Sequence, residues 1–217
     1  MFKAKKLVKI CGITRVDQAL EIAGLGVDAI GLISVKESPR YIPQLKRMEI
    51  FESMVRYFPK IKRVTVVKND LIDKLINTFR DAKLSNVIQL HGDEDIDYCI
   101  ELKKNVPEIK LWKAFRIKNK EDLKVIKSYE NVVDAILLDS WSKDTYGGSG
   151  VRINQEYLKN IEFSKPWWLA GGISIDWIEK ILQEINPDGI DISSSIETTP
   201  GIKDIKETEK LINIIKK

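Results

Sequence analysis

The sequence has few of the residues that most often bind metals or form disulfides. It contains two cysteines and one histidine in 217 residues. Cys11 and Cys99 lie far apart, match no metal-binding or redox spacing, and are not expected to form a disulfide in a reducing compartment. No group of His, Cys and Asp has the spacing of metal ligands, and no dinucleotide-binding or Walker motif is present. The residue pattern therefore gives no signal for a metal or a nucleotide cofactor.

Long apolar runs are also missing. No run approaches the roughly 20 residues that a membrane-spanning helix needs. The basic segment 1–6 is followed by an apolar run, Leu7–Ile10, that is too short for a signal peptide. The charge is nearly balanced, with 36 basic and 32 acidic residues and a net charge of +4, which indicates a solvated surface rather than a nucleic-acid interface. We expect a cytoplasmic protein that binds neither membranes nor nucleic acid.

Short apolar runs and helical patterns alternate along the chain without a linker or a break in composition. The runs are rich in Val, Ile and Leu, as expected for strands that are buried on both faces. Eight strands are predicted, at Leu7–Ile10, Asp28–Ser34, Arg63–Val67, Asn86–Leu90, Lys110–Ala114, Ala135–Asp139, Trp167–Ala170 and Gly189–Ile192. Eight helices are predicted to follow them, at Asp17–Leu25, Gln44–Phe58, Leu71–Ala82, Ile96–Asn105, Lys120–Tyr129, Gln155–Asn160, Ile175–Ile185 and Ile205–Ile215.

This alternation predicts an α/β fold in which residues 1–217 form a single domain, a (β/α)8 TIM barrel. An open, doubly wound sheet is the alternative. It would need a glycine fingerprint after the first strand, and the segment Cys11-Gly12-Ile13-Thr14 is not one.

Two glycine- and serine-rich stretches follow the last two strands. Leu169–Ser174 and Asp191–Glu197 each lie between an apolar run and a helical pattern. In a (β/α)8 barrel, the loops after strands 7 and 8 bind phosphate through backbone N–H groups and a helix N-terminus. The spacing therefore predicts a phosphate site after strands 7 and 8, and a small phosphorylated metabolite as the ligand.

Cys11 and Asp139 are the candidates for chemistry, because function in such a barrel lies at the C-terminal ends of the strands. A thiol and a carboxyl group at one barrel mouth can serve as base and acid in a proton transfer. The thiolate is a good base only if its pKa falls below the usual ~8.5, and the carboxylic acid donates only if its pKa rises. The alternatives are a small buried core residue for Cys11 and a cap before Ser140 for Asp139.

Other residues at the strand ends are suited to binding. Arg40, in a loop stiffened by two prolines, either holds a substrate carboxylate or pairs with an acid at the surface. His91 either points into the mouth or caps the next helix. The turn Gly147–Gly150 is flexible enough to fold over a ligand. Of Trp167 and Trp168, one is expected inside the barrel and the other between the barrel and its helices.

Six motifs occur in one order along the chain. They are Val8–Thr14 (VKICGIT), Ser38–Ile42 (SPRYI), Ile88–Glu94 (IQLHGDE), Leu137–Ser140 (LLDS) with Gly147–Gly150 (GGSG), Leu169–Gly172 (LAGG), and Asp191–Ser194 (DISS) with Glu197 and Pro200–Asp204 (PGIKD). A single glycine pair is weak evidence, but the ordered set closely resembles the phosphoribosylanthranilate isomerase family of tryptophan biosynthesis. The resemblance covers essentially the whole chain.

This resemblance implies an isomerase that converts N-(5-phosphoribosyl)anthranilate to 1-(2-carboxyphenylamino)-1-deoxyribulose 5-phosphate, an Amadori rearrangement without metal or cofactor. It implies that Asp139 is the general acid, that Cys11 is the general base, and that Arg40 binds the anthranilate carboxylate. We also assign His91 to the substrate site. Phosphate contacts are expected, mostly from backbone N–H groups, at Gly148, Ser149, Gly150, Gly171, Gly172, Ser194 and Ser195. A homodimer is one option for the assembly.

The sequence departs from the family pattern in three places. Strand 2 reads Gly31-Leu32-Ile33-Ser34 where the family has a Gly-Phe-Ile-Phe-like run, and strand 3 ends Val-Val-Lys-Asn rather than Val-Phe-Val-Asn. Ser195 stands where the last phosphate loop usually has glycine, so it either distorts this loop or adds a hydroxyl contact.

Three other functions are weaker alternatives. The histidine-pathway isomerase that performs the same rearrangement uses two aspartates, and Cys11 occupies the first of those positions. Indoleglycerol-phosphate synthase would need a lysine-rich mouth and a longer N-terminal extension. A regulatory barrel that only binds a phosphometabolite would need neither Cys11 nor Asp139.

Overall fold

Eight strands in the described part of the chain close into one parallel barrel. The computed structural model describes residues 5–80, 84–140 and 152–217. Neighbouring strands pair in chain order, and β1 pairs with β2 on one side and with β8 on the other. The strands are β1 Leu7–Cys11, β2 Ala29–Ile33, β3 Lys62–Val67, β4 Val87–Leu90, β5 Lys110–Ile117, β6 Ala135–Ser140, β7 Trp167–Leu169 and β8 Gly189–Ile192. The predicted (β/α)8 barrel is confirmed.

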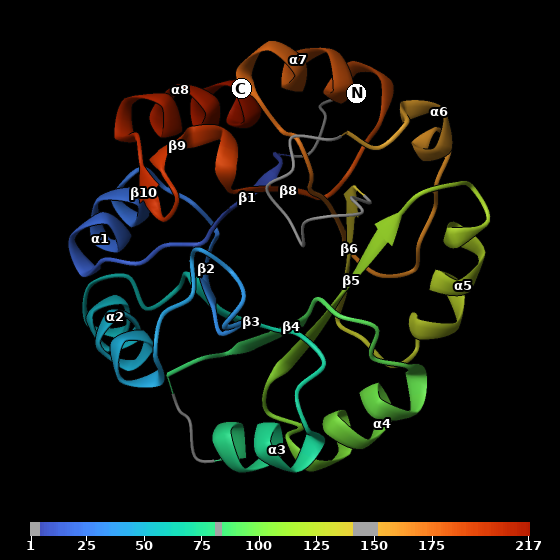
Figure 1. The fold of residues 1–217 in the computed structure, drawn as a ribbon. Coiled ribbons are helices and arrows are strands. Elements are labelled where there is room, and N and C mark those ends of the chain that lie inside the picture. The colour runs from blue at the N-terminus through green and yellow to red at the C-terminus, as the bar shows by residue number, and fades with distance from the viewer. Residues whose placement is uncertain (1–4, 81–83, 141–151) are drawn as a thin grey trace.

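Helices form a ring outside the strands (Figure 1). They are α1 Val16–Gly24, α2 Gln44–Tyr57, α3 Ile72–Arg80, α4 Ile96–Asn105, α5 Asp122–Tyr129, α6 Gln155–Leu158, α7 Ile175–Glu184 and α8 Ile205–Lys216. The helix α6 is shorter than predicted, because Lys159 is extended and Asn160 has a left-handed φ of 60°. No helix in the described ranges combines the length and the apolar content that crossing a bilayer requires.

The strands are apolar because both of their faces are buried. Residues that alternate along each strand either fill the barrel or pack under the helices. Trp168 lies in the inner cluster, where its ring centroid is 4.9 Å from that of Trp112. Trp167 belongs to the outer core and contacts Phe163. The prediction that one tryptophan lies inside the barrel and the other outside is therefore confirmed.

The residues on the inward face of the strands differ toward the C-terminal ends. There the inward positions are polar or small, and they include buried Lys9, Cys11, Gln89, Asp139 and Asp191. Because side chains alternate with a period of two, Lys9 must share the inward face with Cys11 on β1. Charged and polar groups thus converge at one mouth of the barrel.

Two further features of the fold differ from the sequence prediction. The strand β5 continues to Ile117, so Phe115 and Arg116 lie within it rather than after it; its pairing with β6 runs on through Arg116↔Asp139. A 3-10 turn, η1 Ser194–Ile196, and a small hairpin, β9 Glu197–Thr199 with β10 Ile202–Lys203, separate β8 from α8. These pieces are too short and too polar to show a periodic pattern.

Candidate active site

A cavity of about 470 Å³ opens at the C-terminal mouth of the barrel. Every predicted site residue that the structure describes lines it: Cys11, Arg40, His91, Asp139, Gly171, Gly172, Ser194 and Ser195. The other three, Gly148, Ser149 and Gly150, lie outside the described residues. The cavity therefore brings together, from six separate parts of the chain, all the predicted residues that can be located.

Cys11 is the last residue of β1 and is 7% exposed. Burial raises the pKa of its thiol above the ordinary value, while the ammonium groups of Lys9 and Lys203 act in the opposite direction. In this structure burial has the larger effect, so the lowered thiol pKa that favours a base is not found. Two buried cations beside the sulfur nevertheless favour the thiolate once the proton leaves.

Lys9 and Asp191 form a buried ion pair next to Cys11. They face each other in the register between β1 and β8, and Lys9 Nζ lies 2.6 Å from Asp191 Oδ2. Burial alone would lower the pKa of Lys9, but the Asp191 carboxylate outweighs this effect and the pKa is raised. Lys9 therefore stays protonated. The other oxygen, Asp191 Oδ1, is buried with no hydrogen-bond partner among the described residues.

Asp139 lies near the end of β6 and is 4% exposed. Its Oδ1 accepts the Ser140 N–H at 2.8 Å, and its Oδ2 lies 3.1 Å from His91 Nε2. On the other side of the ring, Gln89 Nε2 lies 3.1 Å from His91 Nδ1. Because the Gln89 amide donates to His91 Nδ1, that nitrogen carries no proton in the neutral ring. The imidazole proton is therefore on Nε2, which donates to Asp139. His91 thus points into the mouth, and Asp95, not His91, caps α4.

Arg40 lies in the mouth but already has an acidic partner. Its Nε and Nη2 bind the two carboxylate oxygens of Glu197 at 2.6–3.0 Å. Glu197 also accepts Lys203 Nζ at 2.7 Å and the Gly201 N–H at 3.1 Å. The paired arginine of the alternative prediction is therefore present, although it is buried rather than on the surface. Arg40 passes over Gly12, where a Cβ would lie 2.5 Å from its Cδ.

The two predicted phosphate loops have the backbone shape that brings N–H groups to one place. Gly171 and Gly172 have φ values of +83° and +61°, and Ser174 is the N-cap residue of α7. Ser194 and Ser195 begin the turn η1, and the first N–H groups of a helical turn have no partner inside it. Both loops line the mouth cavity. The arrangement is suited to an anion.

A family model described as N-(5'phosphoribosyl)anthranilate (PRA) isomerase matches residues 8–216. The chain belongs to this family. The N-(5'-phosphoribosyl)anthranilate isomerase of Crocosphaera subtropica is 38% identical over 210 residues, which cover 97% of this chain and 98% of that protein. The same enzyme from Acaryochloris marina is 37% identical and covers 94% of this chain and 95% of its own length. The resemblance drawn from the motifs is confirmed, and the chain is an enzyme.

Solved structures of phosphoribosyl anthranilate isomerases have the same fold as this chain. The structure from Thermotoga maritima has a TM-score of 0.85 and is 29% identical, covering 97% of this chain and 98% of its own. Another was solved in complex with reduced 1-(o-carboxyphenylamino)-1-deoxyribulose 5-phosphate, with a TM-score of 0.78, 28% identity, and coverage of 97% and 98%.

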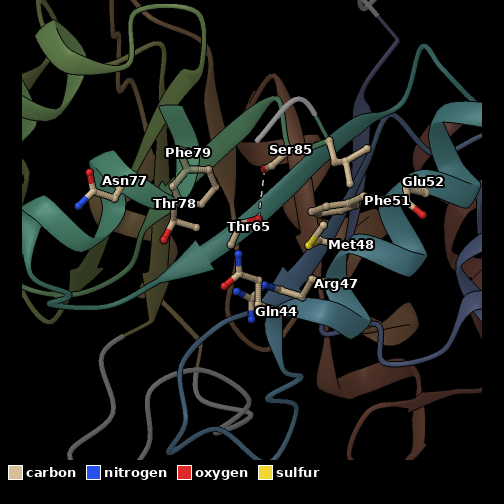
Figure 2. A pocket seen from close by; sticks show the side chains of 11 residues that line it. Gln44, Arg47, Met48, Phe51, Glu52, Thr65, Asn77, Thr78, Phe79 and Ser85 are labelled. Atoms are coloured by element: carbon tan, nitrogen blue, oxygen red, sulfur yellow. Dashed lines mark hydrogen bonds between the residues drawn. The ribbon is translucent and has the colours of Figure 1, made fainter. Parts of the chain in front are cut away.

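A second cavity, of about 410 Å³, lies on the outside of the barrel between α2 and α3 (Figure 2). Phe51 from α2 and Phe79 from α3 line it. Thr65 and Ser85 join by a 3.1 Å hydrogen bond, drawn as a dashed line, and Arg47 donates to the Ile42 carbonyl at 2.7 Å. Arg47, Thr65 and Ser85 are thus engaged in local contacts in this cavity, and none of the predicted site residues that the structure describes lines it.

The sequence did not single out five functional candidates in the mouth: Lys9, Gln89, Asp191, Glu197 and Lys203. A signal for the first three was present, since each is a polar residue inside an apolar strand, at an inward position. Glu197 and Lys203 gave no such signal, because their roles depend on a hairpin that folds back over Arg40. Among the described residues, no group of three His, Cys, Asp or Glu side chains is placed to hold a metal ion.

Proposed function

We propose that the chain converts N-(5-phosphoribosyl)anthranilate to 1-(2-carboxyphenylamino)-1-deoxyribulose 5-phosphate in tryptophan biosynthesis. The observation that carries this proposal is the convergence of Cys11 and Asp139 on one cavity with two glycine- and serine-rich loops. A proton acceptor, a proton donor and an anion site in one cavity are what an aldose–ketose rearrangement of a sugar phosphate needs.

Asp139 is the general acid in this proposal. It gives a proton to the ribose ring oxygen, the bond from that oxygen to C1′ breaks, and the anthranilate nitrogen forms a Schiff base with C1′. The Asp139 carboxyl is nearly buried, and His91 lies 3.1 Å from its Oδ2. His91 therefore orients the Asp139 oxygen that faces its Nε2.

Cys11 is the general base. Its thiolate takes the proton from C2′, and the electron pair of the C2′–H bond forms the C1′–C2′ double bond of an enolamine. The enolamine then loses its hydroxyl proton and gains a proton at C1′, which yields the ketone and leaves the enzyme's proton count unchanged. The Lys203 ammonium group acts to lower the pKa of the Cys11 thiol and so favours the thiolate.

Binding groups hold the two ends of the substrate. Arg40 binds the anthranilate carboxylate through the part of its guanidinium that Glu197 leaves open. The loops at Gly171, Gly172, Ser194 and Ser195 bind the phosphate through backbone N–H groups, with Gly148, Ser149 and Gly150 completing the site. Ser195 adds a hydroxyl where the family pattern has glycine. Two anchored ends fix C2′ against the base.

We further propose that residues 1–217 act as one catalytic domain in the cytoplasm, without metal or cofactor, and that the enzyme assembles as a homodimer. The support for the dimer is a related structure with 27% identity, which is described as mutually generated monomers of a dimeric Thermotoga maritima isomerase.

The test is to make phosphoribosylanthranilate in situ from anthranilate and phosphoribosyl pyrophosphate with the transferase, and to follow its fluorescence decay. The wild-type chain should accelerate the decay. Cys11→Ala and Asp139→Asn should each lower kcat by about 10²-fold or more, the usual contribution of a single acid or base. Cys99→Ala is the matched control, because Cys99 is fully buried in α4, away from the mouth.

Decay no faster than the spontaneous rate, with folded wild-type protein, would contradict the proposed activity. Near-normal turnover by either mouth variant would remove that residue from its role. Loss of activity with EDTA, restored by added metal, would overturn the metal-free reaction.

A further inference from the structure

Lys9 is a fully buried lysine to which the proposed reaction gives no task of its own. It is 0% exposed, it pairs with Asp191, and it interacts directly with the Cys11 thiol. A buried ammonium is costly unless a counter-charge compensates it, and Asp191 Oδ2 at 2.6 Å supplies that charge. An ion pair of Lys9 and Asp191 would stabilise the barrel wherever it lay. Its position beside Cys11, the proposed base, therefore needs a separate explanation.

Gly31 on β2 allows the two side chains of β1 to meet. A Cβ at this position would lie 2.8 Å from Cys11 Sγ and 3.2 Å from Lys9 Nζ. Both distances are shorter than an ordinary contact, so the sulfur and the ammonium nitrogen both lie against a space that the side chain of any other residue would enter. In the register, Cys11 faces Gly31 directly.

We propose that Lys9 is a positioning residue for the base: its ammonium stabilises the thiolate of Cys11, Asp191 holds the ammonium in place, and Gly31 leaves the space where they meet. This inference rests on the proposed function, because it assigns Lys9 to the same proton transfer. It also deepens that function, since it names the group whose positive charge balances the negative charge left on Cys11 Sγ when the thiol loses its proton.

The charges around the pair determine the direction of the effect. The other charged or titratable groups that face Cys11, Lys9 or Asp191 are Lys203 on β10, Arg40 after β2, Asp139 on β6 and His91 after β4. Burial raises the pKa of Cys11, Lys9 and Lys203 lower it, and Asp191 raises it, with Lys9 the stronger of the two partners in the ion pair. Removal of Lys9 should therefore raise this pKa further, even when the charge of Asp191 is removed as well.

The test measures the thiolate directly. Iodoacetamide alkylation of Cys11, mapped by peptide mass spectrometry, is followed from neutral to alkaline pH in the wild type, Lys9→Met and the double variant Lys9→Met/Asp191→Asn. In Lys9→Met the rate at neutral pH should fall about tenfold, and the pH midpoint should rise by about one unit or more. In the double variant both changes should have the same direction but be smaller, because the loss of Asp191 offsets part of the loss of Lys9. Alkylation of Cys99, whose pKa burial raises to about 12, reports any unfolding in the same samples.

The double variant keeps the result interpretable, because it leaves no buried charge without a partner. If Lys9 served only to neutralise Asp191, the double variant would regain wild-type reactivity, and the proposal would be wrong. An unchanged midpoint in folded Lys9→Met would also overturn it. Alkylation needs no substrate, so a chain that shows the shift but fails to rearrange phosphoribosylanthranilate would contradict the proposed function and leave the role of Lys9 intact.

Gly31→Ala tests the same contact without changing a charge. The new methyl group would push Cys11 Sγ away from the Lys9 ammonium. We expect slower alkylation at neutral pH, together with a lower kcat and little change in KM. Wild-type alkylation in folded Gly31→Ala would show that the two groups do not depend on the space at Gly31, which would refute this part of the proposal.

Discussion

Glu197 balances two buried cations at the mouth of the barrel. Its carboxylate binds Arg40 and Lys203 at once, although the side chain is only 4% exposed. Glu197 belongs to the last of the family motifs, but no local pattern in the sequence shows that its carboxylate pairs with a buried arginine. The sequence could predict Arg40 at the mouth from its loop, but not its partner, because that partner is 157 positions away.

Glu197→Gln should destabilise the protein most at neutral pH. Burial alone would raise the pKa of Glu197, but Arg40 and Lys203 outweigh it, and the pKa lies below the ordinary 4.5. A lowered folded-state pKa contributes stability that is present above about pH 4.5 and lost as the pH falls through the folded-state pKa. We expect a loss of about 3 kcal/mol at neutral pH, as for breaking a buried pair.

Urea unfolding of wild type and variant across this pH range measures the difference. The gap between the two free energies of unfolding should narrow as the solution becomes acidic. A gap that stays constant down to strongly acidic pH would mean that the ionised form of Glu197 does not carry the stabilisation.

Gly171→Ala should damage both stability and turnover. The residue has φ +83°, and a Cβ there would lie 2.7 Å from Asp139 Oδ1. The left-handed backbone should cost about 1–2 kcal/mol, and displacement of the acid should lower kcat. Gly26→Ala is the matched control, since Gly26 has φ +82° with nothing within 4 Å of an added Cβ. It should lose similar stability and keep its activity; equal kcat in the two variants would contradict the prediction.

At the level of elements, strands could be predicted better than the pieces between them. Eight apolar runs identified the eight strands of the barrel. A strand that is buried on both faces is a continuous run of apolar residues, which is easy to recognise in the sequence. The hairpin β9–β10 escaped prediction because its five residues are mostly polar and pair only with each other. Its effect is large all the same, since it carries Glu197 and Lys203 to the mouth and leads directly into α8.

Asp204 fixes the point where the hairpin becomes α8. Its Oδ1 accepts the Glu207 N–H at 3.0 Å, which makes it the N-cap residue of the helix. Asp204→Ala should lower the free energy of unfolding by about 1 kcal/mol without changing kcat. Asp204→Asn keeps an acceptor oxygen and should lose only part of this free energy of unfolding. Thermal unfolding and the fluorescence assay measure the two effects, and equal stability losses in both variants would show that the acceptor oxygen which Asn retains contributes nothing.

For the molecule as a whole, the two ends of the barrel have different tasks. The candidate site residues collect at the C-terminal ends of the strands, as the fold predicts. At the opposite end, Arg63 is the second residue of β3 and is 8% exposed. Its guanidinium donates to the carbonyl oxygen of Leu84 and, at 3.3 Å, to those of Pro59 and Ile61. Both ends contain buried charged groups, but only one of them opens into the cavity that holds the acid and the base.

Arg63→Met tests this division. The change leaves up to three carbonyl groups without their donor, so the free energy of unfolding should fall by about 1–3 kcal/mol. Both kcat and KM should stay at wild-type values, because Arg63 lies at the end of the barrel that does not hold the site. Lys62→Met, at the partly exposed neighbouring position, should change stability by less than about 0.5 kcal/mol. A fall in kcat for Arg63→Met at a temperature where the variant is fully folded would mean that packing at the closed end of the barrel controls the geometry of the mouth, and the separation of stability from catalysis would not hold for this enzyme.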